Sequence, residues 1–347
     1  MEEKIIRFYK RFGILSVFAS ALLLKLFFIF RYKDRLYGDA IRALIVGKDY
    51  FLNSSPPFIH NKTYLGPLSW SFIYQHSGIW GLKVINIMSF IALFVVQYFI
   101  GRKAYKYSIL VVALFLFSFY VGTNLNVIAG EQDDNLAMLL FSSGILWYLK
   151  KDRVFLPSLL MGIGFLFKFS IGVFYSGFIV YLAIKGKWKR CLLSAAGMLA
   201  PFICVNLIDH FHSLNILLIS FGIQSGFSSW GIIYFKLFST GLLFSFLISL
   251  WVYIKEKSDF NTLFFWLSSS YLFYVLFIRE AHSASSGMMQ SLLFSSFLIA
   301  TFLFKNGYFF KCIPRPFIIV IALALYLLIT IAITAHNIHY DTHAFGI

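Results

Sequence analysis

Long apolar runs, separated by short clusters of Lys and Arg, recur along the whole 347-residue chain. Hydrophobic residues make up 60% of the sequence and charged residues 13%, well below the roughly 25% charged residues of soluble domains. A helix needs about 20 mostly apolar residues to cross a bilayer. The runs predict an all-α, polytopic integral membrane protein of about 11 spans in one transmembrane domain over 1–347, with no soluble C-terminal domain.

Most of the apolar runs have the length of a single span. We predict helices at about 13–31, 80–100, 107–126, 135–149, 191–209, 234–254, 261–279, 284–304 and 316–335. Basic clusters between spans mark the cytoplasmic side, which places the N-terminus inside and the C-terminus outside. The net charge of +16 is spread over these clusters rather than along one surface, which argues against nucleic acid as a partner.

Residues 155–184 do not fit a single crossing. One span there would put the basic cluster 185–190 on the outer side, whereas the other short basic turns lie inside. Two short helices that turn on the outer side, near Phe167-Lys168-Phe169-Ser170, remove the conflict. We therefore predict a double crossing, in which neighbouring helices cover the break.

The first outer loop, at about 32–79, is long and rich in cations despite lying outside. It and its flank carry Arg31, Lys33, Arg35, Arg42, Lys48 and Lys62. Such cations either hold an anion such as a phosphate or contact anionic lipid headgroups. Pro56-Pro57 and Gly66-Pro67 divide the loop, which predicts short interfacial helices at about 39–48 and 68–77.

Asp39 follows Gly38 in this loop, where a carboxylate can face both water and lipid. It is our candidate for a general base that deprotonates an acceptor hydroxyl. Capping of a helix that begins near Ala40 is the structural alternative.

A second acidic group, Glu131, Asp133 and Asp134, runs directly into the helix predicted at 135–149. The helix dipole accounts for one of these carboxylates more easily than for three. We assign Asp133 and Asp134 to the catalytic site and Glu131 to acceptor binding. A divalent cation held by this group is the other possibility.

Lys168 lies within an otherwise apolar run, and an intramembrane lysine marks a functional site unless it extends to the surface. We predict that it binds a donor phosphate together with Arg279, Lys62 and Arg42. His60 and His282, on the same outer side, are further candidates for acceptor binding.

The order of these features resembles the GT-C superfamily, and within it the protein mannosyltransferase and ArnT-like branch. The resemblance rests on Asp39, Tyr64-Leu-Gly-Pro67-Leu68, the acidic group at 131–134, and Gly162-x-Gly164-x-x-x-Lys168, all within about 15–185. Ala40 stands where relatives often have an acid, and Phe167-Lys168-Phe169 replaces a Thr-Lys-Gly-like motif.

The resemblance implies a membrane glycosyltransferase with its catalytic module at about 15–185, followed by further helices over 186–347. It would transfer a hexose or pentose, with inversion, from a polyprenyl-phosphate sugar to a lipid, glycan or protein acceptor. The reaction would take place at the outer face of a bacterial inner membrane. The resemblance implies no particular cofactor, and a divalent cation is the candidate. The alternative is a transporter or flippase for a lipid-linked or small anionic substrate, with Lys168 as its binding site.

Overall fold

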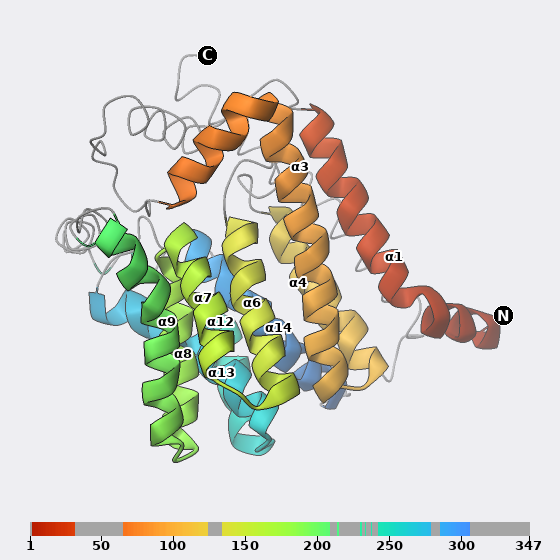
Figure 1. Ribbon diagram of the computed structural model, residues 1–347. Helices are drawn as coiled ribbons and strands as arrows, with labels where there is room; N and C mark the ends of the chain where they lie inside the picture. The colour runs from red at the N-terminus through yellow and green to blue at the C-terminus, as the bar shows by residue number, and fades with distance from the viewer. Residues whose placement is uncertain are drawn as a thin grey trace.

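The computed structural model describes residues 2–31, 65–123, 134–208, 242–278 and 285–305, with isolated residues between 214 and 237. All regular structure in these ranges is helical (Figure 1). The helices are α1 (Glu2–Arg31), α3 (Leu65–Ala104), α4 (Tyr107–Thr123), α6 (Asp134–Lys151), α7 (Phe155–Phe167), α8 (Ser170–Ile184), α9 (Trp188–Ile208), α12 (Leu242–Lys255), α13 (Asp259–Ile278) and α14 (Ser285–Lys305). The prediction of an all-α fold is confirmed. The number of spans stays a prediction, and so do the helices at 39–48 and 316–335, which lie outside the described ranges.

Among the described residues, three helices are long and apolar enough to cross a membrane by themselves: Leu68–Ala104, Trp188–Ile208 and Asp259–Phe277. Shorter apolar helices of 10–17 residues, among them parts of α1, α4 and α14, pack beside them. Large apolar side chains point outward from the bundle, including Phe244, Leu192 and Ile208. In a soluble protein so much exposed apolar surface would be a liability, whereas lipid accommodates it. The chain is an integral membrane protein.

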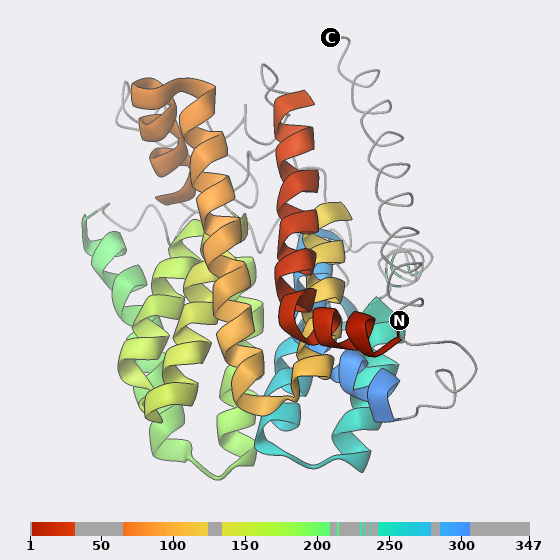
Figure 2. The same cartoon turned by 90° about the vertical axis from the view of Figure 1, so that its right-hand side faces the viewer.

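The helices run up and down in alternation, so that successive turns fall at opposite ends of the bundle (Figures 1 and 2). Helix α7 packs between α6 and α9, and α6 also packs on α3. On the other side of the bundle, α13 contacts α8, α12 and α14, while α4 contacts α14 and α1. Aromatic residues fill the core where these two groups meet, since Phe141 lies 6.0 Å from Phe174 and 5.9 Å from Phe294 between ring centroids.

Residues 155–184 form two helices, as the distribution of basic residues predicts. Helix α7 ends at Phe167 and α8 begins at Ser170, and both ends lie at the same end of the bundle (Figure 1). The break is at Lys168, whose backbone is extended, with φ −151° and ψ 122°. The two helices have 13 and 15 residues, so each is only about 20 Å long.

Helix α3 combines the predicted interfacial helix with the predicted span. It is continuous from Leu65 to Ala104 except at Gly78, where φ is 61° and ψ is −161°. Only glycine adopts this conformation without strain. Trp70 and Leu82, on either side of the kink, are buried in one small apolar cluster. The chain therefore folds back at Gly78, and the segment 65–77 forms an arm at the end of the bundle (Figure 1).

Glycines allow α7 to approach both of its neighbours closely. A Cβ on Gly162 would lie 2.3 Å from the carbonyl oxygen of Met198 in α9, and one on Gly164 would lie 3.0 Å from that of Ala137 in α6. Small residues at helix contacts are typical of membrane bundles, where packing rather than water exclusion drives association. Gly162-x-Gly164 thus has a packing role, with one glycine facing each neighbouring helix.

Candidate functional site

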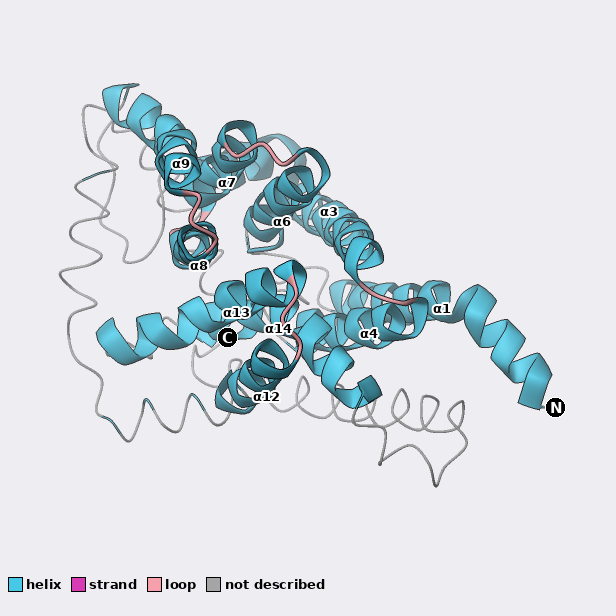
Figure 3. Cartoon of the chain, turned by 90° about the horizontal axis from the view of Figure 1, so that it is seen from below, coloured by secondary structure: helices cyan, strands magenta, loops and turns pink. Residues whose placement is uncertain are grey.

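The bundle has two ends of different chemistry. At one end, which faces the viewer in Figure 3, lie the turns α3–α4, α6–α7, α8–α9 and α12–α13. We call it the basic end, because these turns carry Arg102, Lys103, Lys106, Lys150, Lys151, Arg153, Lys185, Lys187, Lys189, Arg190, Lys255 and Lys257. The C-terminus of α1, the N-terminus of α6 and the break between α7 and α8 lie at the opposite end, which we call the site end.

Most of the site residues predicted from the sequence lie outside the described residues. These are Asp39, Arg42, His60, Lys62, Glu131, Asp133, Arg279 and His282. Their roles stay predictions. Asp134 and Lys168 can be placed, Asp134 as the first residue of α6 and Lys168 between α7 and α8.

The structure brings Asp134 and Lys168 to the same end of two adjacent helices. Ala137 of α6 and Gly164 of α7 are in close contact, as a Cβ on Gly164 would lie 3.0 Å from the Ala137 carbonyl oxygen. Asp134 precedes Ala137 by three residues and Lys168 follows Gly164 by four. Because α6 and α7 are antiparallel, both residues lie about one turn, or roughly 5 Å, beyond this contact toward the site end.

Lys168 is held at the end of α7 by its own backbone. Its N–H donates to the Gly164 carbonyl at 3.1 Å, which closes the last turn of α7, and its carbonyl accepts from the Ile171 N–H at 3.1 Å. The side chain is half-buried. The lysine is therefore fixed by both helices rather than carried on a loop.

Four further buried polar residues, not predicted from the sequence, lie on α1, α3 and α6. They are Lys25, Lys83, Asn86 and Asn135. All four side chains are buried, with Lys83 0% and Lys25 4% exposed. Asn135 Nδ2 donates to Asn86 Oδ1 at 3.0 Å, which joins α6 to α3 one residue after Asp134.

Aromatic contacts place the two buried lysines along one seam between α1 and α3. Phe18 pairs with Phe94 at 4.9 Å and Phe30 pairs with Trp80 at 5.9 Å between ring centroids, as expected for antiparallel helices. Lys25 and Lys83 lie between these two pairs in sequence. The Lys25 ammonium is 5.4 Å from the Phe90 centroid, and that of Lys83 is 5.9 Å from the Trp80 centroid.

Buried lysines close to aromatic faces are suited to an anion at the membrane surface. A cation in low dielectric interacts strongly with a negative ligand and gains from the aromatic quadrupole. The sequence holds the signal for both, since Lys25 in 13–31 and Lys83 in 80–100 interrupt apolar runs as Lys168 does. A lone lysine that interrupts an apolar run therefore identifies Lys25 and Lys83 as well as Lys168.

Within the described ranges, no three His, Cys, Asp or Glu side chains lie close enough together to hold a metal ion. Glu131 and Asp133 are not among these residues. A divalent cation at the acidic group stays a prediction.

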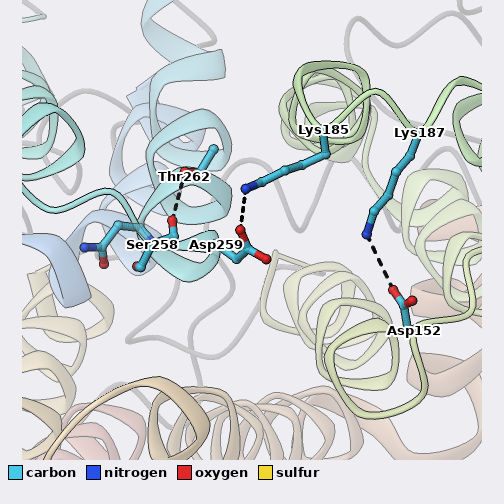
Figure 4. Close-up of polar contacts among 7 residues, drawn as sticks. Asp152, Lys185, Lys187, Ser258, Asp259 and Thr262 are labelled. Atoms are coloured by element: carbon cyan, nitrogen blue, oxygen red, sulfur yellow. Dashed lines mark hydrogen bonds and ion pairs between the residues drawn. The ribbon is translucent and has the colours of Figure 1, made fainter.

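At the basic end, ion pairs connect three of the turns (Figure 4). Arg190 donates to Asp152 at 2.5 Å, Lys187 lies 3.8 Å from the same carboxylate, and Lys185 pairs with Asp259. The hydrogen bond from Arg190 holds the pKa of Asp152 below its usual value, and the same bond raises the pKa of Arg190. The α8–α9 turn is thus tied to both the α6–α7 and α12–α13 turns.

The fold matches two solved membrane glycosyltransferases. ArnT from Cupriavidus metallidurans, in a structure bound to undecaprenyl phosphate, aligns with a TM-score of 0.61 at 14% identity, over 84% of this chain and 60% of that one. The oligosaccharyltransferase AglB from Archaeoglobus fulgidus, in complex with an inhibitory peptide and a dolichol-phosphate, aligns with a TM-score of 0.53 at 11% identity, over 94% of this chain and 56% of that one. The apo form of the Archaeoglobus fulgidus enzyme gives a TM-score of 0.54 at 10% identity.

The chain therefore shares the fold of these two proteins, as the resemblance of its motifs to the GT-C superfamily implies. It spans about three fifths of the length of these two proteins. No family model and no curated protein matches the sequence.

Proposed function

We propose that the chain is a membrane glycosyltransferase that transfers a sugar from a polyprenyl-phosphate donor to an acceptor. The observation that carries this proposal is the presence of buried Lys25 and Lys83, with Lys168, in a bundle of GT-C fold. The fold's neighbours bind undecaprenyl phosphate in one case and dolichol phosphate in the other. A polyprenyl phosphate reaches its enzyme through the bilayer, so a binding site for its phosphate belongs where cations meet apolar helices.

In this proposal the cations stabilise the leaving group, which is the polyprenyl phosphate. During transfer the bond between the anomeric carbon and the phosphate oxygen breaks, and its electron pair leaves with the polyprenyl phosphate, which gains one negative charge. Positive groups fixed where that charge develops lower the barrier. We assign this role to Lys168 and Lys83, together with Arg42, Lys62 or Arg279 of the predicted site.

The acceptor is activated at the same end of the bundle. Its hydroxyl or amine attacks the anomeric carbon from the face opposite the phosphate, forms the new glycosidic bond with inversion, and gives its proton to Asp39. Asp133 and Asp134 orient the acceptor, with Glu131, His60 and His282 around it. The position of Asp134 one turn beyond the α6–α7 contact supports this placement.

The basic end faces the cytoplasm in this proposal, and the site end faces outward. All four turns at the basic end carry cations, which is the usual bias of cytoplasmic loops. A single cysteine introduced at Ser170, next to the break, tests the orientation. Labelling from outside by a membrane-impermeant reagent is expected, whereas labelling only from the cytoplasm would reverse the topology.

The catalytic assignment is tested by the transfer of radiolabelled sugar from polyprenyl phosphate to a membrane extract. Loss of a general base lowers the rate by about 10²–10⁴-fold, so Asp39→Asn is expected to lose activity by this factor. Asp34→Asn, an isosteric change five residues earlier, is the matched control. Equal rates for the wild type and Asp39→Asn would remove Asp39 from the mechanism.

A further inference from the structure

Six cations at the basic end form a surface patch that has no role in the proposed glycosyl transfer. We call Arg102, Lys103, Lys106, Lys150, Lys151 and Arg153 the α3–α6 basic patch, and all six are exposed. They come from the α3–α4 and α6–α7 turns, three from each. The one acidic residue in these turns, Asp152, is hydrogen-bonded to Arg190 of α9.

Two contacts hold the halves of the patch together. Lys103 Nζ donates to the Leu149 carbonyl at 2.6 Å, across from α3 to the last turn of α6. In return, the Lys150 ammonium lies 5.4 Å from the ring centroid of Phe99 on α3. The two groups of cations therefore form one surface that bridges α3 and α6, which are packed side by side (Figure 3).

An apolar surface continues from this patch along the same two helices. On α3, Phe99 and Val95 are exposed one and two turns before Arg102 and Lys103, and on α6 exposed Trp147 lies one turn before Lys150 and Lys151. Residues three or four apart share a helix face. Each helix thus presents cations at the end of the bundle and exposed apolar side chains directly beneath them.

We propose that the α3–α6 basic patch binds an anionic phospholipid whose headgroup carries two phosphates. One phosphate lies against Arg102, Lys103 and Lys106, and the other against Lys150, Lys151 and Arg153. The acyl chains extend along Val95, Phe99 and Trp147. Basic clusters between helices at one membrane face are suited to multiply charged headgroups, and arginine adds bidentate contacts to phosphate oxygens.

A matched pair of triple variants separates a specific site from general charge attraction. The first, Arg102→Gln/Lys151→Gln/Arg153→Gln, removes three charges from the patch. The second, Lys189→Gln/Lys255→Gln/Lys257→Gln, removes three exposed charges from the other turns of the same end. Both leave nine of the twelve cations that the four turns carry, so the overall charge of the basic end is equal in the two variants.

The measurement is the retention of diphosphatidylglycerol by the full chain in phosphatidylcholine nanodiscs, followed by native mass spectrometry. Each basic residue near a membrane surface contributes about 1 kcal/mol, so the patch variant is expected to bind about 100-fold more weakly. The control variant is expected to stay within about threefold of the wild type, a difference below 1 kcal/mol. Phosphatidylglycerol, with one phosphate, is expected to be retained at least about tenfold less well than diphosphatidylglycerol.

Three results would overturn the proposal. Equal losses in the two variants would mean that net charge alone attracts the lipid. Equal retention of phosphatidylglycerol would remove the requirement for two phosphates. Displacement of the lipid by inorganic phosphate would show a simple anion site instead. The proposal does not depend on glycosyl transfer, because none of these residues belongs to the proposed catalytic site.

Discussion

The glycine at position 162 gives the most quantitative prediction about the scaffold of the site. A Cβ at this position would lie 2.3 Å from the Met198 carbonyl oxygen, against 3.4 Å or more in an ordinary contact. Gly162→Ala therefore forces α7 and α9 apart by about 1 Å. The obstacle is backbone, and a carbonyl within a helix cannot rotate away without breaking its own hydrogen bond.

Overpacking of this kind costs about 1–3 kcal/mol. The expected result is a loss of that size in the free energy of unfolding, measured by denaturant titration of the purified protein in detergent micelles. Transfer activity is expected to fall as well, because Lys168 lies at the end of the displaced helix and small misplacements of catalytic groups lower rates strongly.

Gly172→Ala is the matched control. Its Cβ would lie 3.0 Å from an edge atom of the Phe165 ring, a side chain that can turn aside. We expect a change below about 0.5 kcal/mol. Equal stability of the two variants would refute the close packing of α7 against α9.

Three further predictions concern other contacts. Lys83→Gln is expected to weaken binding of undecaprenyl phosphate by about 10–100-fold, since hydrogen bonds to charged groups contribute about 1.5–3 kcal/mol. The control variant Lys255→Gln, at the basic end, is expected to leave this binding unchanged. An unaltered binding isotherm for Lys83→Gln would exclude Lys83 from the site. Ser194→Ala removes one hydrogen-bond partner from each of buried Ser158 and Tyr175, which also bond to each other. A loss of about 1 kcal/mol in the free energy of unfolding is expected, against almost none for exposed Ser176→Ala. The pKa of Asp152 is lowered in the folded state from its ordinary value of 3.8. The stabilising effect of this carboxylate is therefore complete well above pH 3.8 and is lost as the pH falls through the folded-state pKa. Asp152→Asn is expected to remove this part of the acid dependence of stability, and an acid profile identical to that of the wild type would contradict the ion pair.

The sequence predicted the helical architecture well where charge and hydrophobicity act together. The division of 155–184 into two helices followed from the basic cluster at 185–190, because a single crossing would have placed four cations on the wrong side. The separate helix before the second span followed from Gly and Pro punctuation, although the structure joins it to the span through Gly78 rather than through a loop.

The packing was not predictable in the same way. Gly162-x-Gly164 contributed to the family resemblance as a motif, but its contacts with Met198 and Ala137 depend on α7 lying between α9 and α6. That arrangement joins residues 36 and 27 positions apart in the chain, and no local pattern encodes it. Likewise, the pairing of Asn86 with Asn135 joins two spans that are adjacent only in the folded bundle.

The candidate site was found in part. Lys168 stands out because a lone cation interrupts an apolar run, and the structure places it at the same end of the bundle as Asp134. Lys25 and Lys83 interrupt apolar runs in the same way, and their burial distinguishes them from lysines that reach the membrane surface. The sequence alone cannot make this distinction, because snorkelling depends on which face of the helix meets lipid.

The fate of the polyprenyl phosphate is the most direct test of the account. The purified protein, reconstituted with a polyprenyl-phosphate sugar and a membrane extract, is followed by mass spectrometry of the lipid fraction. We expect free polyprenyl phosphate to be released in an amount equal to the sugar joined to an acceptor. Asp39→Asn is expected to abolish both. Movement of the intact donor across the bilayer, with no free polyprenyl phosphate formed, would contradict the account and identify a transporter.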